Sequence, residues 1–219
     1  MDVEFVDKMG SDETVARAAR VSTGRDQLDP GKIEGLIGYL VREGHTSTLE
    51  HCTLTVRVHV PIFVHRQLMT HRTLAKNSES GRYKELEPVF YVPDSEVRPM
   101  ENVGSGAHPN LVHGDINAAD YAGYLHRHVA EVSWGAYQKM ISNFRIATEV
   151  ARNVLPVSIY TSAYLTGNLL AWFNFLRLRG GSQGHPQHEI QEVAKKVALL
   201  IEEHYPITFA AWKATQSAS

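Results

Sequence analysis

The cationic side chains of residues 61–83 form the part of the sequence with the clearest capacity for chemistry. The segment reads PIFVHRQLMTHRTLAKNSESGRY; Glu79 is its only acid, and its cations are Arg66, Arg72, Lys76 and Arg82. Its end, Ser80-Gly81-Arg82, can offer a hydroxyl, backbone N–H groups and a guanidinium to one phosphate. An arginine suits this because its fork meets phosphate oxygens two at a time. A phosphate-bearing ligand site and a solvated basic loop with salt bridges are equally compatible with the residues alone.

Two further arginine segments follow downstream. Arg152 lies in VARNVLP, near the expected end of a helix, where it could simply neutralise the last carbonyl groups. Arg177 and Arg179 lie in NFLRLRGG, and the glycines after Arg179 free the backbone for close approach of a ligand. We therefore expect Arg179, more than Arg152, to contact a ligand.

Cys52 is the only cysteine, which excludes an intrachain disulfide framework and a CxxC motif. It begins an alternating segment, residues 52–60, in which every second residue is apolar. We expect this segment to be a half-buried strand with Cys52 on its core face. A buried cysteine without a cationic neighbour is usually inert, so we expect no cysteine nucleophile.

The composition suits one compact domain, or two intimately fused lobes, because a chain with 43% hydrophobic residues can bury a sizeable core; we expect a single domain over residues 1–219. Its net charge of -2 and pI near 6.6 argue against a nucleic-acid-binding protein. Residues 1–10 lack the apolar core of a signal peptide, and no window approaches the ~20 apolar residues of a membrane helix. We expect a cytoplasmic protein with no membrane and no nucleic-acid partner.

Two alternatives to a small-molecule enzyme site can be weighed on the residues. His185 and His188 are three apart, but they form no HExxH motif, and a zinc site needs about three converging protein ligands. We expect no metal. A nucleic-acid module built on residues 61–84 would need interleaved exposed aromatic residues, which this stretch lacks.

The pattern of helices and strands indicates an α+β fold with a small mixed or antiparallel sheet and a helical bundle in one intertwined domain. Residues 116–141 predict a long helix with one apolar stripe, and residues 93–114 a surface excursion rich in proline and glycine. The other expected helices span residues 11–20, 30–43, 62–71, 145–155, 168–178 and 186–204, with a short last one from 206. The expected strands span residues 3–6, 52–60, 89–92 and 157–165, and residues 73–83 and 180–184 read as loops.

Six segments, in order along the chain, are similar to the flavin-dependent thymidylate synthases. They are ARAARVS (16–22), GHTSTLEH (44–51), residues 61–83, ARNVLP (151–156), residues 168–179 and residues 185–190. The match covers nearly the whole chain, and six ordered segments are far more specific than one. The family signature is Arg-His-Arg followed after seven residues by serine. This chain has Thr70-His71-Arg72 and then Ser80, so Thr70 replaces the first arginine, and Ser78 stands where many members have glutamate.

The resemblance implies a set of site residues. It assigns Arg179 to the uracil ring, as the catalytic group that stabilises negative charge on the pyrimidine. The dUMP-binding residues would be Gln67, Ser80, Gly81, Arg82, Arg152 and Arg179. The FAD-binding residues would be Ser47, Thr70, His71, Arg72, Ser78, Asn168 and Asn174.

The resemblance also implies the reaction and its partners. It predicts reductive methylation of dUMP to dTMP, with methylenetetrahydrofolate as carbon donor, FAD as hydride carrier and NADPH as reductant. It further implies a homotetramer whose active sites are shared between subunits. The changes at Thr70 and Ser78 leave an alternative open, namely a catalytically impaired relative that binds flavin and nucleotide without efficient turnover.

Overall fold

The computed structural model of the chain describes residues 1–24, 29–106, 109–181 and 185–216. The chain divides into two compact units, each built from separate stretches of sequence. Unit 1 comprises Met1–Val58, Met69–Asn77 and Ala163–Ser219, and unit 2 comprises His59–Leu68 and Ser78–Ser162. The division does not test the single domain predicted over residues 1–219, which stays a prediction.

A four-stranded sheet has the order β1 (Asp2–Met9), β2 (Thr53–Pro61), β6 (Tyr160–Asn168), β3 (Ala75–Ser78). Side-chain pairs fix the register of β2 and β6: Thr55 bonds Thr166 at 2.9 Å and His59 bonds Ser162 at 3.1 Å. The numbers rise on one strand as they fall on the other, so the pair is antiparallel. The predicted alternation of β2 is confirmed, because its apolar residues Leu54, Val56, Val58 and Val60 are fully buried.

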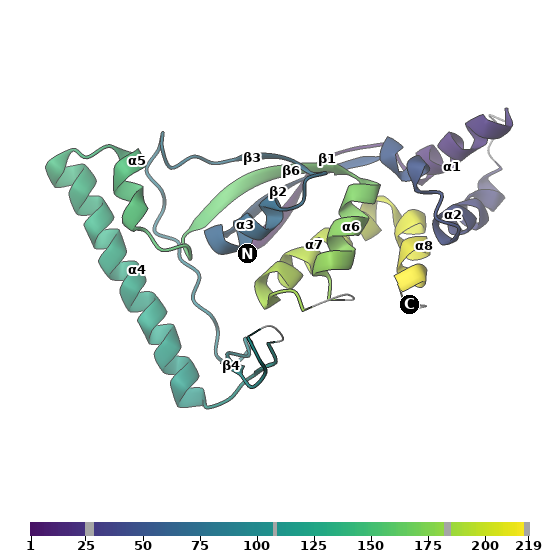
Figure 1. Cartoon of the computed structure of the whole chain (residues 1–219). Helices are drawn as coiled ribbons and strands as arrows, with labels where there is room; N and C mark the ends of the chain where they lie inside the picture. Colours follow the sequence, from purple (N-terminus) through teal and green to yellow (C-terminus); the bar gives the residue numbers. More distant parts are fainter. Residues whose placement is uncertain (25–28, 107–108, 182–184, 217–219) are drawn as a thin grey trace. The chain divides into compact units, whose positions relative to one another are not determined.

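Unit 1 carries helices α1 (Asp12–Arg20), α2 (Ile33–Arg42), α6 (Leu169–Arg179), α7 (His188–His204) and α8 (Pro206–Gln216). Helix α6 packs on α7, and α2 packs on α8; Figure 1 shows α6 and α7 side by side next to the strands. The buried Asp12 carboxylate accepts hydrogen bonds from the Ile207 and Thr208 amides at 3.1 and 2.9 Å, which caps the start of α8. The α+β fold class is therefore confirmed.

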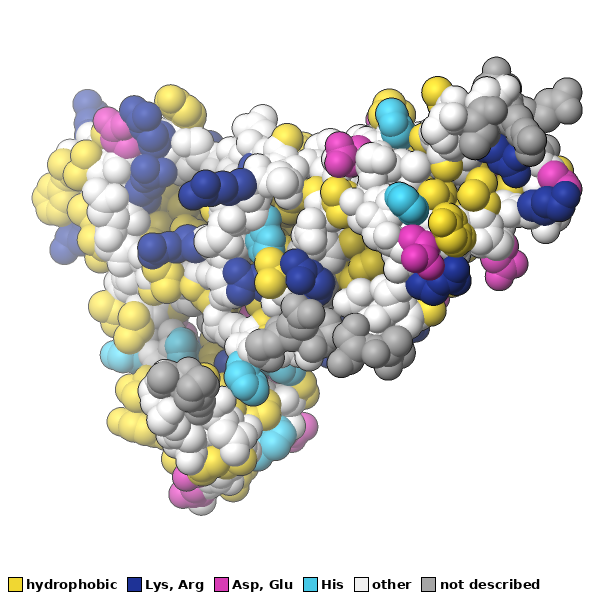
Figure 2. Space-filling view, turned by 45° about the vertical axis from the view of Figure 1, so that its right-hand side comes forward, with side chains coloured by type: hydrophobic (Ala, Val, Ile, Leu, Met, Phe, Trp, Pro, Cys, Tyr) yellow, Lys and Arg dark blue, Asp and Glu magenta, His cyan; other side chains and the backbone are white. Residues whose placement is uncertain are grey.

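Unit 2 carries α3 (Ile62–Met69, its last residue in unit 1), α4 (Ile116–Phe144), α5 (Thr148–Ala151) and the 3₁₀ turn η4 (Arg152–Val154). A two-residue hairpin, β4 (Glu101–Asn102) and β5 (Leu111–Val112), lies within the predicted excursion. Helix α4 buries Ala119, Gly123, Ala130 and Tyr137. Its predicted apolar stripe faces solvent: Tyr121, Leu125, Val129 and Val132 are all exposed. Figure 2 shows hydrophobic side chains on the surface along the left-hand edge, where α4 lies.

Several sequence predictions of local structure were wrong. Residues 73–83 hold strand β3 as well as loop, and residues 89–92 form only one bridge, Phe90 to Ile159. The helix predicted over 145–155 is interrupted, because Arg145 adopts a left-handed φ of 51° that ends α4. The last strand begins at Tyr160 instead of residue 157, since a turn bonds the Ile159 amide to the Pro156 carbonyl at 3.0 Å. Residues 182–184 of the predicted glycine-rich loop lie outside the described residues.

No helix among the described residues has both the length and the apolar character needed to cross a membrane.

Candidate active site

Arg179 is held by two neighbouring residues that lie more than a hundred positions earlier in the chain. Its Nε donates to Nε2 of His71 at 3.2 Å, and its Nη2 donates to Oγ1 of Thr70 at 3.3 Å. All three residues belong to unit 1. The contact brings together the arginine that the resemblance assigns to catalysis and two residues that it assigns to flavin binding.

Helix α6 positions Arg179 at its last residue. The Asn168 side chain accepts a hydrogen bond from the Ala171 amide at 2.8 Å and so caps the first turn. The indole of Trp172, fully buried, donates to the Leu54 carbonyl at 3.0 Å and ties the helix to β2. Gly181, two residues after Arg179, has a φ of +90°, a left-handed conformation that favours glycine. A guanidinium at this end also meets the negative end of the helix dipole.

His71 is a neutral acceptor in this cluster. Its ring packs edge-on against Phe175, with centroids 5.0 Å apart, and Phe175 lies one helical turn before Arg179. Partial burial, followed by the nearby charges of Arg179 and Lys76, lowers the pKa of His71 from 6.5 to about 4. Because Nε2 accepts from Arg179, the single proton of the neutral ring is assigned to Nδ1.

The polar groups of unit 1 fit an electron-rich, phosphate-bearing cofactor. Arg72 is exposed and makes no hydrogen bond or ion pair to any described residue. Lys76 donates to the Met69 carbonyl at 3.1 Å, and Arg179 donates only to neutral groups among the described residues. These three cations are therefore not neutralised by carboxylates within that part of the chain. The other polar groups of unit 1 that could bind such a cofactor are Ser47, Asn168 and Asn174. The Ser47 side chain is exposed, and the two asparagine side chains are half-buried.

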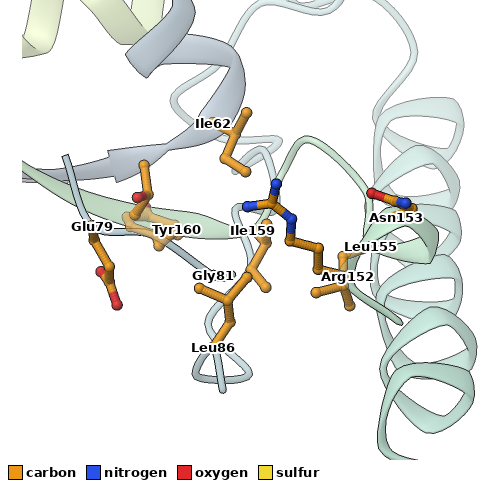
Figure 3. A pocket seen from close by; sticks show the side chains of 10 residues that line it. Ile62, Glu79, Gly81, Leu86, Arg152, Asn153, Leu155, Ile159 and Tyr160 are labelled. Carbon is orange, nitrogen blue, oxygen red and sulfur yellow. The ribbon is translucent and has the colours of Figure 1, made fainter. Parts of the chain in front are cut away.

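A cavity of about 250 Å³ lies within unit 2. Its lining includes Gly81, Glu79, Tyr160 and Arg152, together with Ile62 and other apolar residues. Figure 3 shows the Arg152 side chain extending from its turn toward Ile62, with Glu79 on the other side of Tyr160. Arg152 donates no side-chain hydrogen bond to the described residues, so its charge is available to a ligand. The cavity can hold a small anionic group beside an apolar wall.

Gly81 leaves room that another residue would fill. It is buried, and a Cβ at this position would approach Cδ1 of Leu86 to 3.1 Å. Ser80 Oγ accepts from the Arg82 amide at 3.3 Å, which folds the loop back at this point. Gly81 of the predicted phosphate-binding segment therefore lines the same cavity as Arg152.

Arg82 contacts one carboxylate and one aromatic ring, and the ion pair is what the basic-loop interpretation predicts. Its Nε donates to Glu149 at 2.9 Å, and its guanidinium stacks over Tyr83 at 5.5 Å from the ring centroid. Lys84 forms an ion pair with Glu79. Within residues 61–83 the two interpretations thus apply to different side chains: Arg82 is paired with a carboxylate, whereas Arg72 is not paired with any described residue.

The remaining predicted residues, Gln67 and Ser78, belong to unit 2 and line neither described cluster. Ser78 bonds Nε2 of His65 at 2.8 Å, and Gln67 is half-buried on α3. Sequence reasoning did not foresee the supporting roles of Phe175 and Glu149. The spacing of Phe175 four residues before Arg179 was a usable signal, whereas Glu149 is 67 residues from Arg82 and gave none.

Cys52 is fully buried, as predicted, although it lies just before β2 and not in it. Its thiol contacts the Ser11 carbonyl at 3.4 Å, and burial raises the pKa of the thiol. A protonated, enclosed sulfur is a poor nucleophile. The described residues contain no group of three or more His, Cys, Asp or Glu placed to hold a metal ion.

The chain resembles known proteins along almost its full length. The family model described as "Thymidylate synthase complementing protein" (Thy1) matches residues 4–207. The flavin-dependent thymidylate synthase of Streptomyces avermitilis is 38% identical over 96% of this chain and 89% of the relative. That of Thermosipho africanus is 39% identical over 96% of this chain and 90% of the relative.

Solved structures agree in fold and sequence. A UMP/dUMP methylase, PolB from Streptomyces cacaoi, bound with 5-Br dUMP, superimposes with a TM-score of 0.88 at 39% identity, covering 97% of this chain and 94% of that one. The same protein bound with 5-Br UMP gives a TM-score of 0.87 at 37% identity, covering 97% and 93%. With the family model and these relatives in agreement, the chain belongs to the family of flavin-dependent thymidylate synthases.

Proposed function

We propose that this chain catalyses the reductive methylation of dUMP to dTMP, with methylenetetrahydrofolate as carbon donor and NADPH as reductant. The observation that carries the proposal is Arg179, which two neutral acceptors hold in place while its charge stays uncompensated by the described residues. A fixed guanidinium of this kind can stabilise negative charge that develops on a pyrimidine ring. Bound FAD would supply the hydride-transfer chemistry that these side chains lack.

The other proposed site residues bind and orient the nucleotide and the flavin. Arg152, Ser80 and Gly81 form the proposed phosphate subsite, since Arg152 and Gly81 line one cavity and Ser80 directly precedes Gly81 in the chain. Arg82 and Gln67 complete the nucleotide contacts, with Arg82 exchanging Glu149 for the ligand. The residues proposed to hold flavin are those that the resemblance assigns: Ser47, Thr70, His71, Arg72, Ser78, Asn168 and Asn174.

The proposal includes a homotetramer in which further copies of the chain cover the exposed stripe of α4. The side chains of Tyr121, Val129 and Val132 are 62%, 53% and 60% exposed, on a helix of 29 residues. Contiguous apolar surface of this kind usually marks an interaction site. Light scattering of Val129→Glu should then report a smaller assembly. A cytoplasmic location is also proposed, because a lone buried Cys52 suits a reducing compartment.

The test is tritium release from 5-tritiated dUMP, with FAD, NADPH and methylenetetrahydrofolate each omitted in turn. Release that needs all of them supports the proposal. A flavin spectrum that shifts on adding dUMP, without release, would instead identify the impaired relative. A parallel arm with 5-tritiated UMP is warranted because the solved relatives are named UMP/dUMP methylases. Cys52→Ala should keep most of the release, since the buried thiol has no part in the reaction.

A further inference from the structure

The two hydrogen bonds on Arg179 lie on one edge of its guanidinium. Nε–H and the nearer hydrogen of Nη2 form the side of the arginine fork, and this side meets His71 and Thr70. The outer end, Nη1 with the second hydrogen of Nη2, donates to no described residue. Two acceptors on one edge of a rigid planar group define its orientation more closely than a single acceptor can. The outer edge is therefore presented in one direction.

The two acceptors are of different kinds and are anchored separately. The His71 ring is fixed by its edge-on contact with Phe175 of the same helix that carries Arg179. Thr70 is exposed, and its β-branched side chain has few rotamers, so its hydroxyl has a defined position without needing to be buried. Removing the Thr70 hydroxyl would leave the guanidinium with His71 as its single acceptor among the described residues, so that Arg179 would also leave the His71 ring more often.

We propose that Thr70 is a positioning residue that orients the outer edge of Arg179 toward the pyrimidine. The inference rests on the proposed function. It reinterprets the replacement in the family signature: an arginine at position 70 would add a second cation and offer no acceptor to Arg179, whereas threonine supplies the acceptor. Thr70 then contributes to catalysis by positioning Arg179, and its presence does not indicate a catalytically impaired relative.

The first test compares Thr70→Val, which keeps the side-chain shape but loses the acceptor, with Thr70→Ser, which keeps the acceptor. Because Thr70 is exposed, neither change threatens folding. We expect Thr70→Val to lower kcat about tenfold with little change in the KM for dUMP, as loss of one hydrogen bond to a charged group implies. Thr70→Ser should stay close to the unsubstituted enzyme. Equal kcat for Thr70→Val and the unsubstituted enzyme, or equal losses in both variants, would overturn the proposal.

A second readout does not depend on turnover. NMR of histidine-labelled full-length protein, with and without FAD, reports the tautomer and the pKa of His71, and His71→Gln identifies its resonance among the 12 histidines. In Thr70→Val the loosened Arg179 should spend less time against the ring, so the pKa of His71 should rise from about 4. Unchanged His71 resonances would refute the positioning role. If no tritium were released but the His71 shift were seen, the proposed function would fail while the contact stood.

A third variant, Thr70→Arg, separates this proposal from the impaired-relative alternative. This variant restores the Arg-His-Arg triplet of the family. If threonine at position 70 impairs catalysis, Thr70→Arg should raise the turnover number. The positioning role predicts the reverse, a lower kcat, because the new guanidinium repels Arg179 and offers it no acceptor. A higher kcat for Thr70→Arg than for the unsubstituted enzyme would overturn the proposal.

Discussion

The arginines of the two units are held by different kinds of partner. In unit 1, Arg179 is half-buried and bonded to a hydroxyl and a neutral imidazole. In unit 2, Arg82 is exposed and paired with the Glu149 carboxylate at 2.9 Å. Neutral acceptors orient a guanidinium and leave its charge intact, whereas a carboxylate orients it and cancels the charge. Arg179 can thus interact with a negatively charged ligand directly, whereas Arg82 must first release the Glu149 carboxylate.

Removing the side chain of Arg179 should have the largest effect on catalysis. Arg179→Ala takes away an oriented cation that would stabilise charge developing in the transition state, and such groups are worth about a hundred- to a thousandfold in kcat. Arg177→Ala is the matched control, since Arg177 is exposed on the same helix, two residues earlier, and belongs to no assigned site. Tritium-release kinetics measure both. Comparable losses in the two variants would show that helix charge, and not the held guanidinium, matters.

The second-largest effect is expected from Arg152, the arginine of unit 2 that is not paired with any described residue. Arg152→Ala removes a cation that is not paired with any described residue and lines the cavity, so dUMP binding should weaken by about 1.5–3 kcal/mol. Arg82→Ala should weaken binding less, because part of its interaction with dUMP replaces the existing pair with Glu149. Calorimetry with dUMP and FAD-loaded enzyme measures both affinities. A larger effect at Arg82 than at Arg152 would reverse the comparison between paired and unpaired cations.

The sequence predicts the elements better than it predicts the site. Helix α2 and strand β2 follow from their apolar periodicity, because burial of one face decides both. Strand β3 was missed because Ala75-Lys76-Asn77-Ser78 has no strand-like composition, and its pairing with β6 depends on tertiary structure.

The contacts that define the site lie between distant segments. Arg179 meets His71 across 108 residues and Arg82 meets Glu149 across 67, and neither pairing leaves a periodic signal. The resemblance named Arg179, His71 and Thr70 separately, but only the fold shows that they touch.

Neutral His71 makes the contact between Arg179, His71 and Thr70 sensitive to acid. Burial, followed by the facing charges of Arg179 and Lys76, lowers the pKa of His71 to about 4 in the folded chain, against 6.5 for an ordinary histidine. The unfolded chain therefore binds more protons between these values, and stability falls as pH drops from 6.5 toward 4. Urea unfolding at several pH values should show a shallower loss for His71→Gln, which cannot titrate. Parallel losses in both proteins would assign the acid sensitivity to other groups.

The smallest effect is expected from the carboxylate partner in unit 2. Glu149→Gln keeps the side-chain shape but removes the charge that holds Arg82, and exposed ion pairs of this kind contribute about 0–1 kcal/mol. The freed guanidinium should bind the phosphate of dUMP slightly more tightly, by up to about fivefold, and the gain should disappear in the Arg82→Ala background. Calorimetry on the double-mutant cycle measures the coupling. Weaker dUMP binding in Glu149→Gln would mean that the carboxylate holds Arg82 in its ligand-binding position, so a charged partner can also prepare a cation for its ligand.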